Sequence, residues 1–269
     1  EAKRNGFEVC IAAPYCEKSL KKIKNMGFKF YELEISRSGM NPIFELKLIY
    51  QFYRLFLDLK PDILHLITIK PYLYGGIVAR ILGVPSVVSA VSGLGIVFSS
   101  NKYRYKILRL ILIPFYKISF GHKNQKVIFQ NKDDRNALLN WGVIKNDKVE
   151  FIRGSGVDLD VFLYKQEDDK NIIIAFAARL LIDKGVNVFI DAARILKGKG
   201  LDAEFWLIGD IDPGSSNSVS ESQLEYLKKE GLVVVLGHRA DMSDLFTRIN
   251  ILAYPSFYGE GLPKVLLEA

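Results

Sequence analysis

Short apolar runs alternate with longer amphipathic segments along the first half of the chain. The apolar runs predict strands at 7–13, 28–33, 62–67, 86–91, 126–129 and 149–152. Apolar residues at helical spacing predict helices between them, at 18–26, 43–59, 72–82, 102–120 and 132–141. This alternation is typical of a parallel sheet with helices on both faces and right-handed crossovers.

The rhythm breaks at 153–170, a segment rich in Gly and Asp, and then restarts. Strands are predicted at 172–177, 204–208, 233–236 and 251–254, and helices at 186–196, 223–230 and 241–248. Small polar residues at 214–222 predict a mobile loop. We therefore expect an α/β protein of two Rossmann-like, doubly wound domains, 1–164 and 165–269. Because the chain starts and stops within helical patterns, we expect it to be truncated at both ends.

Two of the predicted helices have a distinct composition. The helix at 102–120 is both basic and apolar, with Pro114 as a candidate kink. In the helix at 43–59, apolar residues recur at helical spacing, namely Leu46, Ile49, Tyr50, Tyr53 and Leu57.

Composition places the chain among globular proteins. Hydrophobic residues make up 49% and charged residues 25%, and 269 residues suffice for two α/β domains. The two cysteines, Cys10 and Cys16, form no CxxC motif, which disfavours a disulfide framework and predicts a cytosolic chain. The most apolar run, 107–116, contains Arg109 and Pro114, so no membrane-spanning segment is predicted.

The net charge of +7 is divided unequally along the chain. Residues 1–150 hold 24 Lys and Arg against 12 Asp and Glu, a net +12, whereas residues 151–269 hold 13 against 18, a net −5. A basic surface attracts nucleic acid, anionic lipid or phosphorylated substrates. The alternative is that the charge serves solubility alone.

One candidate for chemistry is the segment 260–268. Pro263 suits the first turn of a helix, which leaves Glu260 in the preceding loop and Glu268 about two turns into the helix. Gly261 lets the backbone approach a ligand closely. The helix N-terminus offers N–H groups to a diphosphate, while the two carboxylates can bind hydroxyls. The alternative is a helix cap with one solvated Glu.

A second candidate is the segment 179–185, where Arg179 follows a predicted strand and Lys184 opens a helix. Ligands in open α/β sheets bind at the carboxyl ends of the strands, which is where this segment falls. The two cations can clamp a diphosphate and stabilise its charge as a bond breaks. The alternative is an ordinary surface pair between Arg and Asp.

Several short motifs, in order, resemble the retaining GT-B glycosyltransferases of family 4, the glycosyl transferases group 1. The resemblance covers nearly the whole chain. Its most specific motif is the pair Glu260 and Glu268 with Pro263 between them. The matching pieces are Gly154-Ser-Gly-Val-Asp158 with Phe162, Arg179 with Asp183-Lys184-Gly185, Leu207-Ile-Gly209, Gly237, Tyr254-Pro-Ser256, and Glu260-Gly-Leu-Pro with Glu268. The resemblance implies two Rossmann-like domains that face a cleft.

The resemblance also implies a role for the charged residues of these motifs. Glu268 is similar to the Glu that holds the donor ribose, and Glu260 to the one that faces the transferred sugar. Arg179 and Lys184 resemble the diphosphate clamp, which in this family replaces a metal ion. No metal and no cofactor are therefore expected, since the nucleotide-sugar is itself a substrate.

Two further segments are implied to line the donor site. One contributes backbone against the donor, and the other, whose plain alternative is a turn between strand and helix, forms the pocket for the nucleotide base. They are Gly261, Leu262 and Pro263, and Gly237, His238 and Arg239, respectively.

The first half is similar to a bacterial subgroup that extends sugars on undecaprenyl diphosphate for glycan, capsule or lipopolysaccharide assembly. The similarity is carried by Thr68-Ile-Lys70-Pro71 and by Ser92-Gly93-Leu94-Gly95 with Phe98. It implies retaining transfer of a sugar, with an N-acetylhexosamine as a candidate, from a donor that we expect to be UDP-linked to a lipid-linked acceptor. Lys70 then meets an acceptor phosphate, or is an ordinary exposed Lys.

The subgroup implies a cytoplasmic enzyme that is peripheral on the inner face of the cytoplasmic membrane. The basic N-terminal half is then expected to contact the anionic membrane surface, through a helix at 101–126 in which cations alternate with aromatic residues. The alternative is a core helix with a solvated basic face. No nucleic-acid partner is expected, because no recognition motif accompanies the charge.

Some residues depart from the family pattern or fit other functions. Many members carry His where this chain has Ser92, so the catalytic role on the acceptor side stays unassigned. Gly93 and Gly95 follow a strand and are counted as candidate cofactor-binding residues, but a dinucleotide loop needs a third glycine where Phe98 stands. The three histidines are scattered and resemble no metal set. The remaining alternatives are a UDP-sugar epimerase of the same fold and a non-enzymatic basic binding protein.

Overall fold

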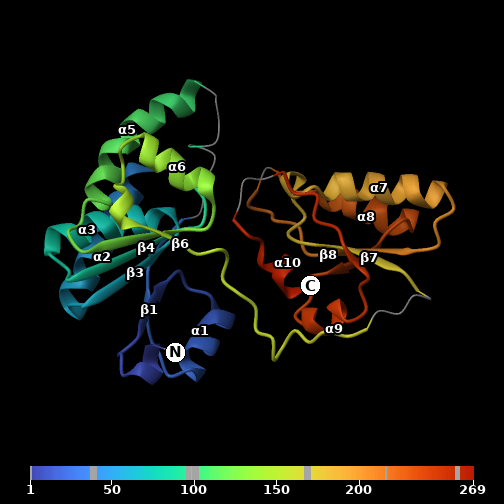
Figure 1. Ribbon diagram of the computed structural model, residues 1–269, viewed down its shortest axis with the longest axis horizontal. Coiled ribbons are helices and arrows are strands. Elements are labelled where there is room, and N and C mark those ends of the chain that lie inside the picture. Colours follow the sequence, from blue (N-terminus) through green and yellow to red (C-terminus); the bar gives the residue numbers. More distant parts are fainter. Residues whose placement is uncertain are drawn as a thin grey trace. The chain divides into compact units, whose positions relative to one another are not determined.

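Figure 1 shows the computed structural model of the chain, which describes residues 2–36, 41–94, 98, 103–166, 171–215, 217–257 and 261–269. The chain divides into two compact units, unit 1 (Glu1–Phe151) and unit 2 (Ile152–Ala269). The boundary expected at 164/165 therefore lies inside unit 2. Residues 152–164 belong to unit 2, where Gly154 packs against Leu262 and Leu267. A Cβ on Gly154 would lie 3.4 Å from Leu262 Cβ.

Unit 1 contains two parallel sheets among its described residues. Strands β3 (Ile63–Ile67), β4 (Ser86–Val91), β5 (Gln125–Phe129) and β6 (Val149–Phe151) form one sheet in the order β3-β4-β5-β6. Strands β1 (Cys10–Ala13) and β2 (Lys29–Glu32) pair with each other in a separate two-stranded sheet. The parallel pairing is as predicted, but the expectation of one continuous sheet is wrong for these strands.

The helical elements of unit 1 lie between the strands as the spacing predicts. They are η1 (Ala2–Asn5), α1 (Glu17–Asn25), α2 (Pro42–Leu59), η2 (Pro71–Gly75), α3 (Gly76–Leu82), α5 (Tyr103–Ser119), α6 (Lys132–Asn140) and η3 (Asn146–Lys148). The helix expected at 72–82 begins with a π-helical turn, η2, that includes Pro71. Helix α2 begins at an Asn41 side chain that accepts from the Ile43 N–H, with Pro42 in the first turn.

Helices α2 and α5 both pack against the η2–α3 segment, so the three form one layer on the sheet. Glycines make the close approach feasible: a Cβ on Gly75 would lie 3.2 Å from Leu66 and 3.6 Å from Phe52 of α2. A Cβ on Gly76 would lie 2.1 Å from Ser119 Oγ of α5. Larger residues at these two positions would push both helices off the segment between them.

The core of unit 1 is rich in aromatic residues. Tyr72, Tyr116 and Phe120 pack with ring centroids 5.6–6.0 Å apart. Burial raises the pKa of the Tyr116 phenol to about 12 and also raises that of Tyr72. Both phenols are therefore neutral at any physiological pH.

Helix α2 does not turn toward this core the side on which Leu46, Tyr50, Tyr53 and Leu57 recur at helical spacing. Those four side chains are exposed, whereas Leu48, Phe52 and Phe56 are buried. The spacing predicted the helix, but α2 is apolar on two sides.

The described residues of unit 2 form one parallel sheet in the order β10-β7-β8-β9, which is covered on both faces. Its strands are β7 (Ile173–Ala177), β8 (Glu204–Ile208), β9 (Val234–Gly237) and β10 (Ile251–Leu252). One core contains Phe189 of α7 (Val186–Gly198) and Leu227 of α8 (Glu221–Glu230); the other contains Leu245 of α9 (Met242–Phe246). Helix α10 (Lys264–Glu268) and the turn η4 (Ile182–Lys184) complete the unit. Helices α7 and α8 thus cover one face and α9 the other, as Figure 1 shows.

The two units confirm the predicted α/β class with parallel sheets. No helix within the described ranges is long and apolar enough to cross a membrane.

Candidate functional site

The carboxyl ends of the four strands of unit 2 meet at one edge of the sheet, because all pairs are parallel. Arg179 follows β7, Asp210 follows β8, His238 follows β9 and Tyr254 follows β10. Open α/β sheets bind ligands at this edge. The expected segments 179–185 and 237–239 therefore both begin at this edge.

Lys184 lies where η4 meets the N-terminus of α7. Its Nζ donates to Tyr254 Oη at 3.0 Å and lies 5.6 Å from the centroid of the Tyr254 ring. The Phe257 N–H donates to the Asp183 carbonyl at 3.1 Å, so the segment after β10 is fastened to the turn before α7. Tyr254 stood in a sequence motif without a role, and the structure makes it the side chain that positions Lys184.

Gly185 makes this contact geometry feasible. Its φ is +83°, and a Cβ there would lie 2.2 Å from the Pro255 carbonyl oxygen. A side chain at this position would be both strained and in steric conflict. Because α7 spans 13 residues, its N-terminal N–H groups and dipole add to the positive charge of Lys184.

Arg179 is held by a carboxylate that the sequence did not point to. Its Nη1 donates to Asp212 Oδ2 at 2.7 Å, and Ser218 Oγ accepts from the Asp212 N–H at 2.8 Å. The Arg179 side chain is 62% exposed, so the pair is weak in free energy and open to exchange for another anion. The ordinary Arg–Asp pair considered for this segment is what the structure contains.

The loop after β9 has its own fixed geometry. The His238 N–H donates to Asp210 Oδ1 at 3.0 Å, which joins this loop to the end of β8. The guanidinium of Arg239 binds both oxygens of Asp241, with Nε 2.8 Å from Oδ1. This pairing lowers the pKa of Asp241 to about 2 and raises that of Arg239. Gly237 ends β9, so the three candidate residues for the base line one turn.

Glu268 lies in α10 and is mostly buried. Its Oε1 pairs with Lys264 Nζ at 2.9 Å, one turn earlier on the same helix. Gly261 and Leu262 precede Pro263, which caps α10. Glu260, the other carboxylate of the predicted pair, lies outside the described residues, as does Gly95.

The candidate glycine Gly93 belongs to unit 1, just after β4. Leu94 beside it is buried, and Phe98 packs its ring 5.0 Å from Trp141 and 5.2 Å from Tyr116. Phe98 is therefore a core residue, which explains why no glycine stands at its position. No group of three or more His, Cys, Asp and Glu in the described ranges is arranged to hold a metal ion.

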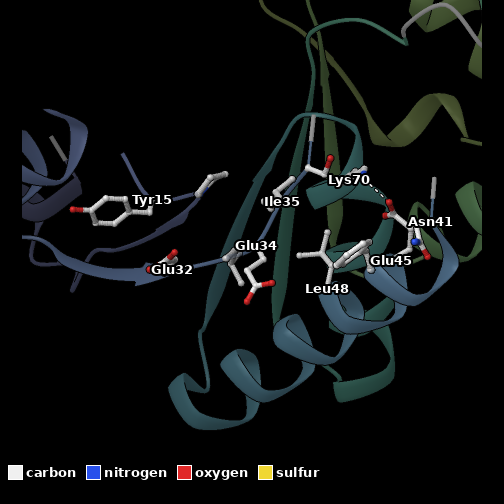
Figure 2. A pocket seen from close by; sticks show the side chains of 12 residues that line it. Tyr15, Glu32, Glu34, Ile35, Asn41, Glu45, Leu48 and Lys70 are labelled. Atoms are coloured by element: carbon white, nitrogen blue, oxygen red, sulfur yellow. Dashed lines mark hydrogen bonds and ion pairs between the residues drawn. The ribbon is translucent and has the colours of Figure 1, made fainter. Parts of the chain in front are cut away.

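Unit 1 has a cavity of about 650 Å³ at the carboxyl ends of β1, β2 and β3. Figure 2 shows Lys70 and Glu45 pointing toward one another at its side, joined by a largely buried ion pair. Lys70 was expected to meet a phosphate or to be exposed, and it is not exposed. The lining residues are Pro14, Tyr15, Glu32, Leu33, Glu34, Ile35, Ser36, Asn41, Phe44, Glu45, Leu48 and Lys70.

The charges of this cavity disfavour a phosphate ligand. Three carboxylates line it against one lysine, and Lys47 binds Glu34 from outside the lining. Glu45 Oε2 is buried and has no hydrogen-bond partner among the described residues. Burial and the neighbouring Glu45 raise the pKa of Tyr74. Hydroxyl and amide N–H donors suit such a lining better than a phosphate does. Sequence reasoning missed Glu45, whose only signal was its place in the helix after β2.

The chain matches known families in both units. Residues 1–131 match the family described as Glycosyl transferase 4-like, and residues 164–269 match Glycosyl transferases group 1. The chain is 30% identical over 275 residues to the N,N'-diacetylbacillosaminyl-diphospho-undecaprenol alpha-1,3-N-acetylgalactosaminyltransferase of Campylobacter jejuni, covering 97% of this chain and 70% of that protein. These matches confirm the resemblance drawn from the sequence motifs.

A second relative and a solved structure extend the comparison. The UDP-Gal:alpha-D-GlcNAc-diphosphoundecaprenol alpha-1,3-galactosyltransferase of Escherichia coli is 25% identical over 238 residues, with 84% of this chain and 59% of that protein covered. HepE from Anabaena, in complex with UDP and glucose, superposes with a TM-score of 0.73 at 18% identity, covering 99% of this chain and 71% of that one. The fold is thus shared with a protein that binds UDP.

Proposed function

Because this chain belongs to the glycosyl transferases group 1 family and has the GT-B fold, we propose that it moves a sugar from a nucleotide-sugar to a lipid-linked acceptor, with retention of configuration. The observation that carries the proposal is Lys184, held by Tyr254 at the N-terminus of α7, on the ligand-binding edge of unit 2. That the chain is a glycosyltransferase follows from its family; its donor, acceptor and site residues are the proposal.

In the proposed donor site, the diphosphate lies between Lys184, the α7 N-terminus and Arg179. Arg179 either leaves Asp212 to bind the diphosphate or binds both at once. Breaking this ion pair costs little free energy, because the Arg179 side chain is exposed. Arg can then bind phosphate oxygens through two parallel hydrogen bonds. Two cations and a helix N-terminus supply the charge stabilisation that a metal ion supplies elsewhere.

The remaining donor contacts are proposed from the family resemblance. Glu268 binds the ribose hydroxyls, Glu260 faces the sugar, and the backbone of residues 261–263 lies against the donor. The turn of Gly237, His238 and Arg239 receives the base. The fixed geometry of that turn, through Asp210 and Asp241, supports a preformed pocket.

The chemical step is a substitution at C1 of the sugar. The bond from C1 to the diphosphate oxygen breaks, and its electron pair leaves with the nucleoside diphosphate. The acceptor hydroxyl oxygen forms the new bond to C1 on the same face, and its proton passes to the departing diphosphate. The cations at the edge of unit 2 stabilise the negative charge that develops on the leaving group.

We propose a UDP-linked donor and a sugar such as an N-acetylhexosamine. Support comes from the names of the relatives, one of which transfers N-acetylgalactosamine and another galactose from UDP-Gal, and from the UDP bound by HepE. Both relatives act on sugars carried by diphospho-undecaprenol, which supports a lipid-linked acceptor in bacterial glycan or capsule assembly. The acidic cavity of unit 1 suits the sugar end of that acceptor, because carboxylates accept hydrogen bonds from hydroxyl and acetamido groups.

A lipid-linked acceptor lies in a membrane, so the proposed reaction takes place at the membrane surface. We propose that the enzyme is peripheral on the cytoplasmic side, with unit 1 toward an anionic surface. Unit 1 carries the basic half of the sequence, with a net charge of +12 against −5 for unit 2.

A transfer assay tests this proposal. Radiolabelled UDP-sugars are incubated with the protein and with an acetamido-sugar diphosphoryl lipid, with and without EDTA. We expect labelled lipid, undiminished by EDTA. An epimerase would instead convert the free UDP-sugar without acceptor, and a binding protein would do neither.

Tyr15→Ala, at the exposed rim of the acidic cavity, should raise KM for the acceptor several-fold and leave KM for the donor unchanged. Tyr226→Ala on α8 is the matched control.

A further inference from the structure

The helical layer of unit 1 exposes two stripes of apolar side chains on its outer side. Each of these side chains leaves between 39% and 77% of its surface exposed. The α2 stripe consists of Ile43, Leu46, Tyr50, Tyr53 and Leu57. The α5 stripe consists of Tyr103, Ile107, Leu110, Ile111, Phe115 and Ile118.

Each stripe follows one side of its helix, opposite the side that is buried. On α2, steps of three and four residues keep the stripe in line, while Leu48, Phe52 and Phe56 face the core. On α5 the stripe has the same spacing, while Tyr116 and Ser119 are buried. A helix at a water-exposed surface ordinarily has one polar side, so apolar residues on both sides indicate a contact on the outer one.

The two stripes lie on the same side of unit 1. Helices α2 and α5 each contact η2 and α3, which lie between them, and η2 contacts β3 of the sheet. The buried sides of both helices therefore face inward, toward that segment and the sheet. Helix α3 between them also has an exposed apolar side chain, Ile81, which is 69% exposed.

The charges of α5 identify the chemistry of what covers it. Its 17 residues include Arg104, Lys106, Arg109 and Lys117 and no Asp or Glu. Lys106 and Lys117, about three turns apart, follow one edge of the stripe, and Arg104 stands at the other edge. Apolar residues flanked by cations are the pattern of a helix that lies in the boundary between acyl chains and anionic headgroups. The tyrosines of both stripes suit the same depth, since their rings are apolar and their hydroxyls polar.

We infer that α2 and α5 form one docking face, through which unit 1 lies on an anionic bilayer with both helices in the plane of the surface. The inference rests on the proposed function, for which it names the surface that meets the lipid-linked acceptor. A second copy of the chain fits this face less well, because it would bring the cations of two α5 helices together without a carboxylate between them.

Vesicle co-sedimentation of the full chain tests the docking face without donor or acceptor. The vesicles are phosphatidylcholine alone or mixed with phosphatidylglycerol. The variants Leu110→Gln with Ile111→Gln, and Leu46→Gln with Leu57→Gln, should each weaken partitioning about tenfold, since each removes two apolar side chains from the boundary. Val188→Gln with Ile195→Gln on α7, two exposed aliphatic residues of unit 2, is the matched control and should change nothing.

Charge variants separate the electrostatic part of the interaction. Lys106→Gln with Lys117→Gln should weaken binding to the anionic vesicles roughly tenfold and leave the weak binding to neutral ones unchanged. Lys21→Gln with Lys22→Gln, exposed cations of α1, should have little effect. Thermal unfolding of every variant should match that of the parent, because all of these side chains are exposed.

The results decide between clear outcomes. The inference would be overturned if both stripe variants bound vesicles as strongly as the parent protein and the control variants do. So would stripe variants that convert a dimer into a monomer at unchanged vesicle binding, since the face would then join two copies. Transfer to a short-chain, water-soluble acceptor keeps the two proposals apart. If the stripe variants transfer normally to it, docking alone is affected; if the parent protein binds vesicles but transfers to no acceptor, the proposed function fails while the docking face stands.

Discussion

Units 1 and 2 are built from the same alternation of strand and helix, but their surfaces are adapted to different contacts. Unit 2 gathers Arg179, Lys184 and the α7 N-terminus at the carboxyl edge of one continuous sheet, within an acidic polypeptide. Unit 1 is basic, has an acidic cavity at its strand ends and exposes apolar stripes on its helices. One architecture thus carries the proposed anion site in one unit and the proposed docking face in the other.

The largest effect is expected where the proposed anion site of unit 2 loses a cation. Lys184→Ala removes the cation nearest the α7 N-terminus and should lower turnover of the donor by about 10²–10³-fold, as for the loss of one group that stabilises a leaving charge. Glu268→Ala should also lower turnover by orders of magnitude, through the loss of ribose binding. Initial rates with a UDP-sugar measure both. Lys199→Ala, just past the end of α7, is the control. Near-normal rates for both variants would mean that the site is assigned to the wrong residues.

The next effect concerns the turn that positions Lys184. Gly185→Ala forces a Cβ toward the Pro255 carbonyl at a positive φ, and we expect a loss of about 2 kcal/mol or more in the free energy of unfolding. Gly198→Ala, in the same helix with no atom within 4 Å of the new Cβ, should be neutral or slightly stabilising. Urea unfolding compares the two. Equal stabilities would show that the segment after β10 can move away from the turn.

In unit 1 the corresponding test is the ion pair beside the cavity. Lys70→Ala leaves the Glu45 carboxylate largely buried without its cation, which should destabilise unit 1 by about 2 kcal/mol. The double variant Lys70→Ala with Glu45→Gln should regain part of the loss, because the remaining group is neutral. A double-mutant cycle of unfolding free energies gives the coupling. A coupling of zero would place both groups in contact with solvent.

The smallest effect is a pH dependence at the turn after β9, the proposed pocket for the base. Arg239 lowers the pKa of Asp241 to about 2, below its ordinary value of 3.8. A depressed pKa stabilises the fold at pH values above the unfolded pKa, and this contribution is lost as the pH falls from about 4 toward 2. Asp241→Asn should therefore be slightly less stable than the parent at pH 7 and equal to it near pH 2. A difference that grows at low pH would contradict the pairing.

The sequence predicted the elements of both units well, because apolar spacing and Gly or Pro boundaries are local signals. It also predicted which segments reach the edge of unit 2, since parallel strands bring their carboxyl ends to the same edge of a sheet. It did not predict that Asp212 holds Arg179, because the two are 33 residues apart and meet only through the pairing of β7 with β8. Nor did it distinguish the two apolar sides of α2, because periodicity identifies a helix and not which side the core covers.

Other features depended on packing that no local pattern reveals. The division of unit 1 into two sheets depends on which strands pair, and the close fit of η2 and α3 between two helices depends on Gly75 and Gly76. The sequence predicts a Lys70 that is exposed or binds a phosphate, whereas Glu45 from α2 holds it beside a cavity. The position of Lys70 just after β3 indicated a functional residue, but nothing in the sequence indicated that its partner lies in α2, which precedes β3.

The central claim, that unit 2 binds a nucleotide-sugar through Lys184 without a metal ion, is tested most directly by thermal unfolding with added nucleotides. UDP, GDP, ADP and their common sugars are compared, with and without EDTA, on the parent protein and on Lys184→Ala and Lys199→Ala. We predict stabilisation by UDP and its sugars that EDTA leaves unchanged, that Lys199→Ala retains and that Lys184→Ala loses. A chain that responds to no nucleotide, or whose response is the same in all three proteins, would contradict the claim.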